Sequence, residues 1–161
     1  GQGMVGPIPV PVLYFAGVAI IAYIFLRYTI VGRRIYATGG NLEAAKLVGI
    51  KTDRILMLVY IINGLLAAFA GFLMTAWLGV AQANAGQGYE LDVIAATVIG
   101  GTSLQGGEGT ILGTVIGAII MGVLRNGLIL LGVSSFWQQV AIGSVIIIAV
   151  AFDQLRGGKE S

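Results

Sequence analysis

The residues of this sequence that could do chemistry are few, and most of the cations among them lie in one short interval. The sequence holds nine Lys and Arg residues, seven Asp and Glu residues, and no His or Cys. The interval 32–54 reads GRRIYATGGNLEAAKLVGIKTDR and is the only long hydrophilic stretch of the chain. Most of the cations lie in or beside it, and they are Arg27, Arg33, Arg34, Lys46, Lys51 and Arg54.

This interval also contains the signals of a short helix. Asn41 is suited to cap the free N–H groups of the first turn, residues 42–48 are mostly helix formers, and Gly49 is suited to the left-handed position that ends a helix. Thr52 and Asp53 then fit the cap and the first turn of the next helix. A cationic loop that presents one short helix is suited to dock a partner, and its Lys and Arg residues can also meet lipid head groups.

Most forms of catalysis are excluded by what the sequence lacks. Without His and Cys, a serine or cysteine triad and the usual zinc sites are improbable. Gly106, Gly107 and Gly109 suggest a phosphate loop, but the pattern GxxxxGK[ST] does not occur. We therefore expect no catalytic site, no metal, no cofactor and no nucleotide bound by this chain, and no nucleic-acid partner.

The composition indicates an integral membrane protein. Hydrophobic residues make up 57% of the chain and charged residues 10%, and the mean hydropathy is +0.95. An ordinary soluble domain carries roughly 25% charged residues. One crossing needs about 20 mainly apolar residues. We expect an all-α polytopic transmembrane bundle of about five spans, one of them short or broken.

The expected spans follow from the apolar segments. The three prolines lie in the first eleven residues and favour extended chain there. Five glycines between residues 100 and 110 follow a short apolar segment, which suggests a span that is thin, broken or re-entrant. The predicted spans are about 12–28, 55–78, 88–101, 110–133 and 137–153.

The distribution of cations predicts the orientation. If the loop 32–54 is cytoplasmic, five crossings place nearly all Lys and Arg residues inside and place Glu90 and Asp92 outside. The opposite orientation would export nearly all of the positive charge. We therefore expect a multi-pass membrane protein whose loop 32–54 lies on the cytoplasmic side.

Three stretches resemble one family over about residues 9–156. They are the loop GRRIYATGGNLEAAKLVGIKTDRI, the segment GQGYELDVIAATVIGGTSLQGGEGTILGTVIGAIIMGVLRNGLILLGV, and WQQVAIGSVIIIAVAFDQLR. Together they closely resemble the distal half of the permease subunits of ribose-type monosaccharide ABC importers. On this resemblance, residues 1–161 are the C-terminal half of a transmembrane permease domain in a longer membrane protein. The resemblance also implies a multi-pass protein of the bacterial cytoplasmic (inner) membrane.

The resemblance implies a coupling helix that docks on an ATPase. Import permeases of this kind carry an EAA-and-glycine signature, and the matching residues here are Glu43, Ala44, Ala45 and Gly49, with Asn41 as the cap. The Leu-Pro ending of the wider signature is absent, because Thr52 and Asp53 lead directly into the next span. The implied partners are an ABC ATPase subunit, a periplasmic or extracellular solute-binding protein, and a second permease subunit in a homodimer.

The solute path is predicted from isolated polar residues in the spans. A neutral sugar needs uncharged hydroxyl, amide and aromatic groups in a cleft. Arg125 either faces this path or ends its helix at the outer interface. Glu90 and Asp92 are suited to seat the binding protein. The candidates for the path are Tyr60, Asn63, Thr97, Arg125 and Asn126.

Small residues spaced four apart predict close helix packing, with lining of the solute path as the alternative. In the second span these are Gly64 with Ala68 and Ala67 with Gly71. In the fourth they are Gly109, Gly113 and Gly117.

Two other functions stay open. A branched-chain amino acid importer permease shares the architecture and much of the glycine pattern, and Arg125 could then meet the zwitterion. A channel or membrane anchor would use no ATP. The runs GYELD and IGGTSL favour the sugar importer, but the sequence does not identify the sugar.

Overall fold

The computed structural model describes residues 4–5, 8–81, 84 and 86–157, and of these the side chains only from residue 9 to residue 151. Its elements are seven helices, α1 to α7, and two strands of two residues each, β1 and β2. The prediction of an all-helical bundle is confirmed, apart from this small pair of strands. The chain divides into two compact units, residues 1–87 and 88–161, which are described separately.

The first unit contains two long helices joined by two shorter ones. β1 (Met4–Val5) pairs antiparallel with β2 (Ile8–Pro9) and leads into α1 (Val10–Tyr28). The other long helix is α4 (Thr52–Leu78), and the rings of Tyr14 and Phe69 pack edge to face between α1 and α4 at 6.1 Å. The expectation of extended chain is confirmed at Met4–Val5 and Ile8–Pro9 and was wrong at Pro11, which lies in the first turn of α1, where no intrahelical N–H is required.

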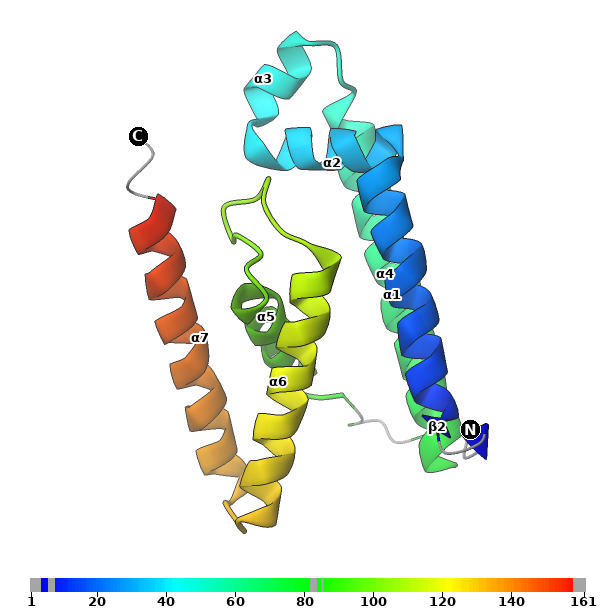
Figure 1. The fold of residues 1–161 in the computed structure, drawn as a ribbon, viewed down its shortest axis with the longest axis vertical. Coiled ribbons are helices and arrows are strands. Elements are labelled where there is room, and N and C mark those ends of the chain that lie inside the picture. Colours follow the sequence, from blue (N-terminus) through cyan, green and yellow to red (C-terminus); the bar gives the residue numbers. More distant parts are fainter. Residues whose placement is uncertain (1–3, 6–7, 82–83, 85, 158–161) are drawn as a thin grey trace. The chain divides into compact units, whose positions relative to one another are not determined.

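The hydrophilic interval between α1 and α4 is more helical than we predicted. It folds into α2 (Ile30–Gly40) and α3 (Leu42–Leu47), and only the second was expected. Thr29 starts α2, because its Oγ1 accepts a hydrogen bond from the Gly32 N–H at 3.0 Å. Figure 1 shows α2 running across the ends of α1 and α4, and it contacts both of them and α3.

The second unit is built from α5 (Tyr89–Ile99), α6 (Ile111–Leu130) and α7 (Ser135–Gly157). The short helix α5 packs against both longer ones, as Figure 1 shows. The core of the second unit is one small cluster of buried residues, with partly buried neighbours around it. The cluster consists of Ala95, Ala96, Met121 and Ile142.

Close packing of α5 on α6 depends on glycine. A Cβ atom on Gly117 would overlap the carbonyl group of Ala96, and one on Gly113 would overlap the carbonyl group of Gly100. The packing prediction is therefore confirmed at these two glycines. Gly109 lies in the loop before α6, where its Cβ would press on Thr102. Gly64 and Gly71 meet nothing within 4 Å, so in the described residues they mediate no such contact.

The helix lengths bear directly on membrane insertion. Among the described residues, α1, α4 and α6 are long and apolar enough to cross a membrane, and the segment Ser135–Ala151 of α7 is a shorter apolar helix. With 11 residues, α5 rises only about 16 Å and cannot cross roughly 30 Å of hydrocarbon. Few residues of the long apolar helices are buried within this chain, as is typical of lipid-facing helices of a multi-pass membrane protein.

Candidate functional site

The first candidate site is the corner formed by α2, α3 and the start of α4. Asn41 caps α3 as predicted, because its Oδ1 accepts a hydrogen bond from the Ala44 N–H at 2.9 Å. Gly49 ends the helix in the left-handed region, with φ of 83°. The predicted cap of the next helix was wrong by one residue: Lys51 occupies that position without a side-chain hydrogen bond, and Thr52 is already helical and buried. Asp53 lies in the first turn of α4, as predicted.

The chain fixes α3 to the adjoining helices through its inner face. Ala45 is buried, with 3% of its surface exposed, and its carbonyl accepts a hydrogen bond from the Ile50 N–H at 3.0 Å. Ile55 and Thr52 of α4 are buried at the same corner. α3 is therefore a short helix that contacts both α2 and α4.

The outer face of α3 does not include both alanines of the signature. Ala44 is exposed, whereas Ala45 packs inward. The outer face instead carries Leu47, which is 89% exposed, and Val48, which is 76% exposed. Sequence reasoning missed these two residues, although apolar residues beside a helix end in a cationic loop were a visible signal.

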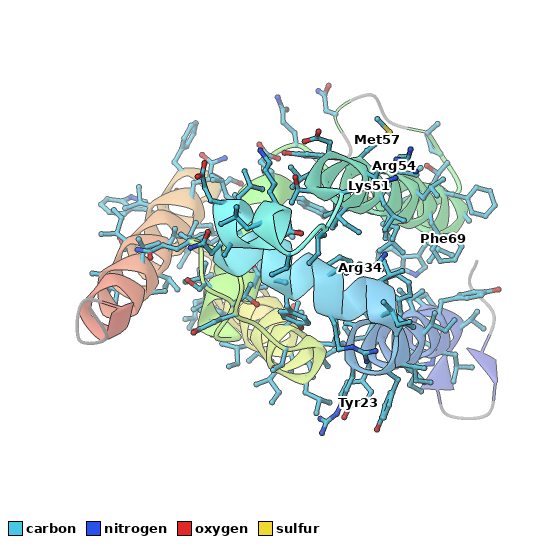
Figure 2. All side chains as sticks on the ribbon, turned by 90° about the horizontal axis from the view of Figure 1, so that it is seen from above. Tyr23, Arg34, Lys51, Arg54, Met57 and Phe69 are labelled. Atoms are coloured by element: carbon cyan, nitrogen blue, oxygen red, sulfur yellow. The ribbon has the colours of Figure 1, made fainter. Side chains whose placement is uncertain are left out.

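Cations surround this corner on several elements. Arg33 and Arg34 are exposed on α2, and Lys51 and Arg54 are exposed at the start of α4. Figure 2 looks down on α2 and α3 and shows Arg34 on the α4 side of α2, with Lys51 and Arg54 on α4. The positive charge therefore gathers at one end of the first unit, where it can attract an acidic partner or anionic lipid.

A second cluster lies in the second unit, between α5 and α6. The Arg125 guanidinium donates a hydrogen bond to the Asp92 carboxylate and forms an ion pair with it. The Cζ atom of Arg125 also lies 4.7 Å from the centre of the Tyr89 ring, in a cation–π contact. The side chain of Asp92 is 19% exposed and that of Arg125 is 37% exposed. The sequence assigned these residues to separate roles, and the structure brings them together.

The remaining candidates for the solute path are divided between the two units. Tyr60 and Asn63 are exposed on α4 in the first unit, and Asn126 is exposed on α6 in the second. Thr97 of α5 donates its hydroxyl hydrogen to the Ile94 carbonyl at 2.8 Å. Glu90 is exposed in the first turn of α5. The described residues contain no group of three or more acidic side chains placed to hold a metal ion.

Comparisons with known proteins identify similar sequences over most of this chain. The family model described as branched-chain amino acid transport system / permease component matches residues 3–150. The ribose import permease protein RbsC of Bacillus subtilis is 51% identical over 156 residues, which cover 97% of this chain and 48% of that protein. RbsC of Haemophilus influenzae is 47% identical over 99% of this chain and 50% of its own length.

A xylose permease is also similar to this chain. The xylose transport system permease protein XylH of Haemophilus influenzae is 47% identical over 91% of this chain and 39% of its own length. The chain thus spans about half the length of the ribose permeases that it matches. No solved structure matches the chain.

Proposed function

Because the chain belongs to the family of branched-chain amino acid transport system permease components, we propose that it forms the distal half of a permease subunit in a binding-protein-dependent ABC importer. The cargo of this importer is a ribose-like monosaccharide. In this proposal the chain has no catalytic site, and a separate subunit hydrolyses ATP. The helices conduct the sugar across the bacterial inner membrane.

The observation that carries the proposal is the projecting helix α3. A permease must receive mechanical work from an ATPase, which requires a short rigid element fixed to two spans. α3 is capped by Asn41, ended by Gly49 and packed through Ala45, so a force on it reaches α1 and α4. Its outer face, with Leu47 and Val48, offers apolar anchors that are surrounded by Lys and Arg side chains.

Two further partners follow from the proposed topology. With α3 on the cytoplasmic side, the first turn of α5 faces outward, and exposed Glu90 is suited to meet a solute-binding protein. Asp92 shares this turn, but its carboxylate is engaged by Arg125. A second permease subunit completes the pathway and forms a homodimer with this one.

The nature of the solute is supported by one contact in the second unit. A branched-chain amino acid carries a carboxylate, and Arg125 is the cation that could have met it. Asp92 already neutralises Arg125, so this side chain does not offer a free positive charge to a zwitterion. Uncharged groups such as Tyr60, Asn63, Thr97 and Asn126 suit the hydroxyls of a neutral sugar. The ribose and xylose permeases among the relatives support the same class of cargo.

The proposal is tested by transport in proteoliposomes. The full-length permease is reconstituted with its ATPase and its binding protein, and labelled ribose, xylose and leucine are supplied with and without ATP. We expect ATP-dependent accumulation of a pentose against its gradient and no accumulation of leucine. Accumulation of leucine would support the amino acid importer, and downhill flux without ATP would support a channel.

A further inference from the structure

The ion pair of Asp92 and Arg125 lies at one end of the contact between α5 and α6. Near the C-terminal end of α5, the backbones touch at Ala96 and Gly117. At the N-terminal turn of α5, the contact is made by the ion pair and by the Tyr89 ring under the guanidinium. α5 is therefore fixed to α6 at both of its ends, by close backbone packing at one and by charge at the other.

Each charge of this pair offsets the cost of burying the other. An arginine within an apolar membrane helix is costly unless it is paired or reaches water. Asp92 supplies the opposite charge, and its position in the first turn of α5 is favourable for a carboxylate, because the free N–H groups of a helix start carry partial positive charge. Asp92 is less exposed than Arg125, so removing either charge would leave the other partly buried without its partner.

We propose that Asp92 and Arg125 are a positioning pair for transport, which holds the first turn of α5 against α6 so that the two helices move as one body during the transport cycle. The inference rests on the proposed function, since a transport cycle must exist for the pair to act in it. The pair takes no part in binding the sugar. Asp92 acts through Arg125 and not through the binding protein.

A positioning role differs measurably from direct contact with the solute. If α5 and α6 must move together, weakening the pair lowers the maximal rate of uptake and leaves the concentration of sugar for half-maximal uptake unchanged. If Arg125 bound the sugar, its loss would raise that concentration instead. If Asp92 seated the binding protein, its loss would weaken stimulation of the ATPase at low binding-protein concentration, and a change at Arg125 would not compensate.

The experiment uses four variants of the full-length permease in its complete importer. The single variants are Asp92→Asn and Arg125→Gln, and the third combines them into a neutral pair. The matched control is Glu108→Gln, because Glu108 is an exposed carboxylate of the same unit that lies outside α5. We expect each single variant of the pair to lower the maximal rate by roughly tenfold, and the neutral pair to recover most of it. The control should stay within about twofold.

Two results would overturn the inference. One is a neutral pair that transports no better than the worse single variant. The other is an increase in the half-saturating sugar concentration in Arg125→Gln alone.

A second measurement is independent of transport. Thermal unfolding of the same four purified variants should show that the two single losses do not add in the neutral pair. If the losses of thermal stability in the two single variants added up in the neutral pair, the energetic coupling between Asp92 and Arg125 would be contradicted, even if no ATP-driven uptake were found. Conversely, non-additive losses of stability together with no uptake by the unmodified importer would refute the proposed function. The contact between Asp92 and Arg125 would still be supported.

Discussion

Gly117 of α6 lies against the backbone carbonyl of Ala96 of α5, and no side chain fits between them. Replacing Gly117 with Ala should therefore destabilise the second unit by about 1–3 kcal/mol, because the new methyl group must push the two backbones apart. The measurement is thermal unfolding of the purified full-length permease. Gly122→Ala is the matched control, since nothing lies within 4 Å of a Cβ at that position of the same helix. Equal effects at both positions would contradict this packing.

The exposed side chain of Leu47 should be needed for coupling and not for folding. Leu47→Glu places a charge on the outer face of α3, where Leu47 is 89% exposed, so the fold should persist. We expect ATP-driven uptake to fall by roughly tenfold or more, which is the loss typical of a central interface anchor. Leu131→Glu is the control, because Leu131 is 80% exposed and follows α6. Unchanged uptake in Leu47→Glu would remove Leu47 from the docking surface.

The end of α3 should depend on the backbone of residue 49. Gly49→Ala forces a Cβ into the left-handed region, where φ is 83°, at a cost of about 1–2 kcal/mol. Gly49→Asn should cost less, because asparagine tolerates this conformation better. We expect uptake to follow the order Gly, Asn, Ala, with insertion into the membrane unchanged. Nothing lies within 4 Å of a Cβ here, so a steric clash cannot explain that order.

The buried hydroxyl of Thr38 should not contribute to stability. Thr38 is 4% exposed, and its Oγ1 has no hydrogen-bond partner among the described residues. Thr38→Val keeps the shape and removes the unpaired polar atom, so unfolding should be unchanged or slightly harder. Thr110→Val is the contrasting variant, because the Thr110 Oγ1 accepts a hydrogen bond from the Gly113 N–H at 3.0 Å, and its loss should cost about 1 kcal/mol. A clear loss of stability in Thr38→Val would indicate a partner for its hydroxyl.

Local signals in the sequence predicted much of the fold. Asn41 and Gly49 act through their own backbone neighbours, so their capping roles could be predicted from residue type and spacing. Helix α2 could not be predicted in this way, because Gly39, Gly40 and two arginines give its segment the composition of a hydrophilic loop. Its start also depends on the hydroxyl of Thr29. The long helices were expected from their mainly apolar composition, although α4 begins at Thr52 and not at residue 55.

The candidate sites were less predictable, because they depend on contacts between distant residues. Asp92 and Arg125 lie 33 positions apart, and no periodicity relates them. The inward face of Ala45 likewise depends on how α3 packs on its neighbours. Composition located the cationic corner, but only the packing separates the buried Ala45 from the exposed Leu47.

The central claim is that α3 receives work from an ATPase on the cytoplasmic side. The most direct measurement introduces a single cysteine at Leu47 of a full-length permease without other cysteines, in sealed cells and in the assembled importer. We predict that an impermeant maleimide added outside leaves this cysteine unlabelled, and that a short thiol crosslinker joins it to the ATPase subunit. Labelling from outside, together with no adduct to the ATPase, would contradict the account.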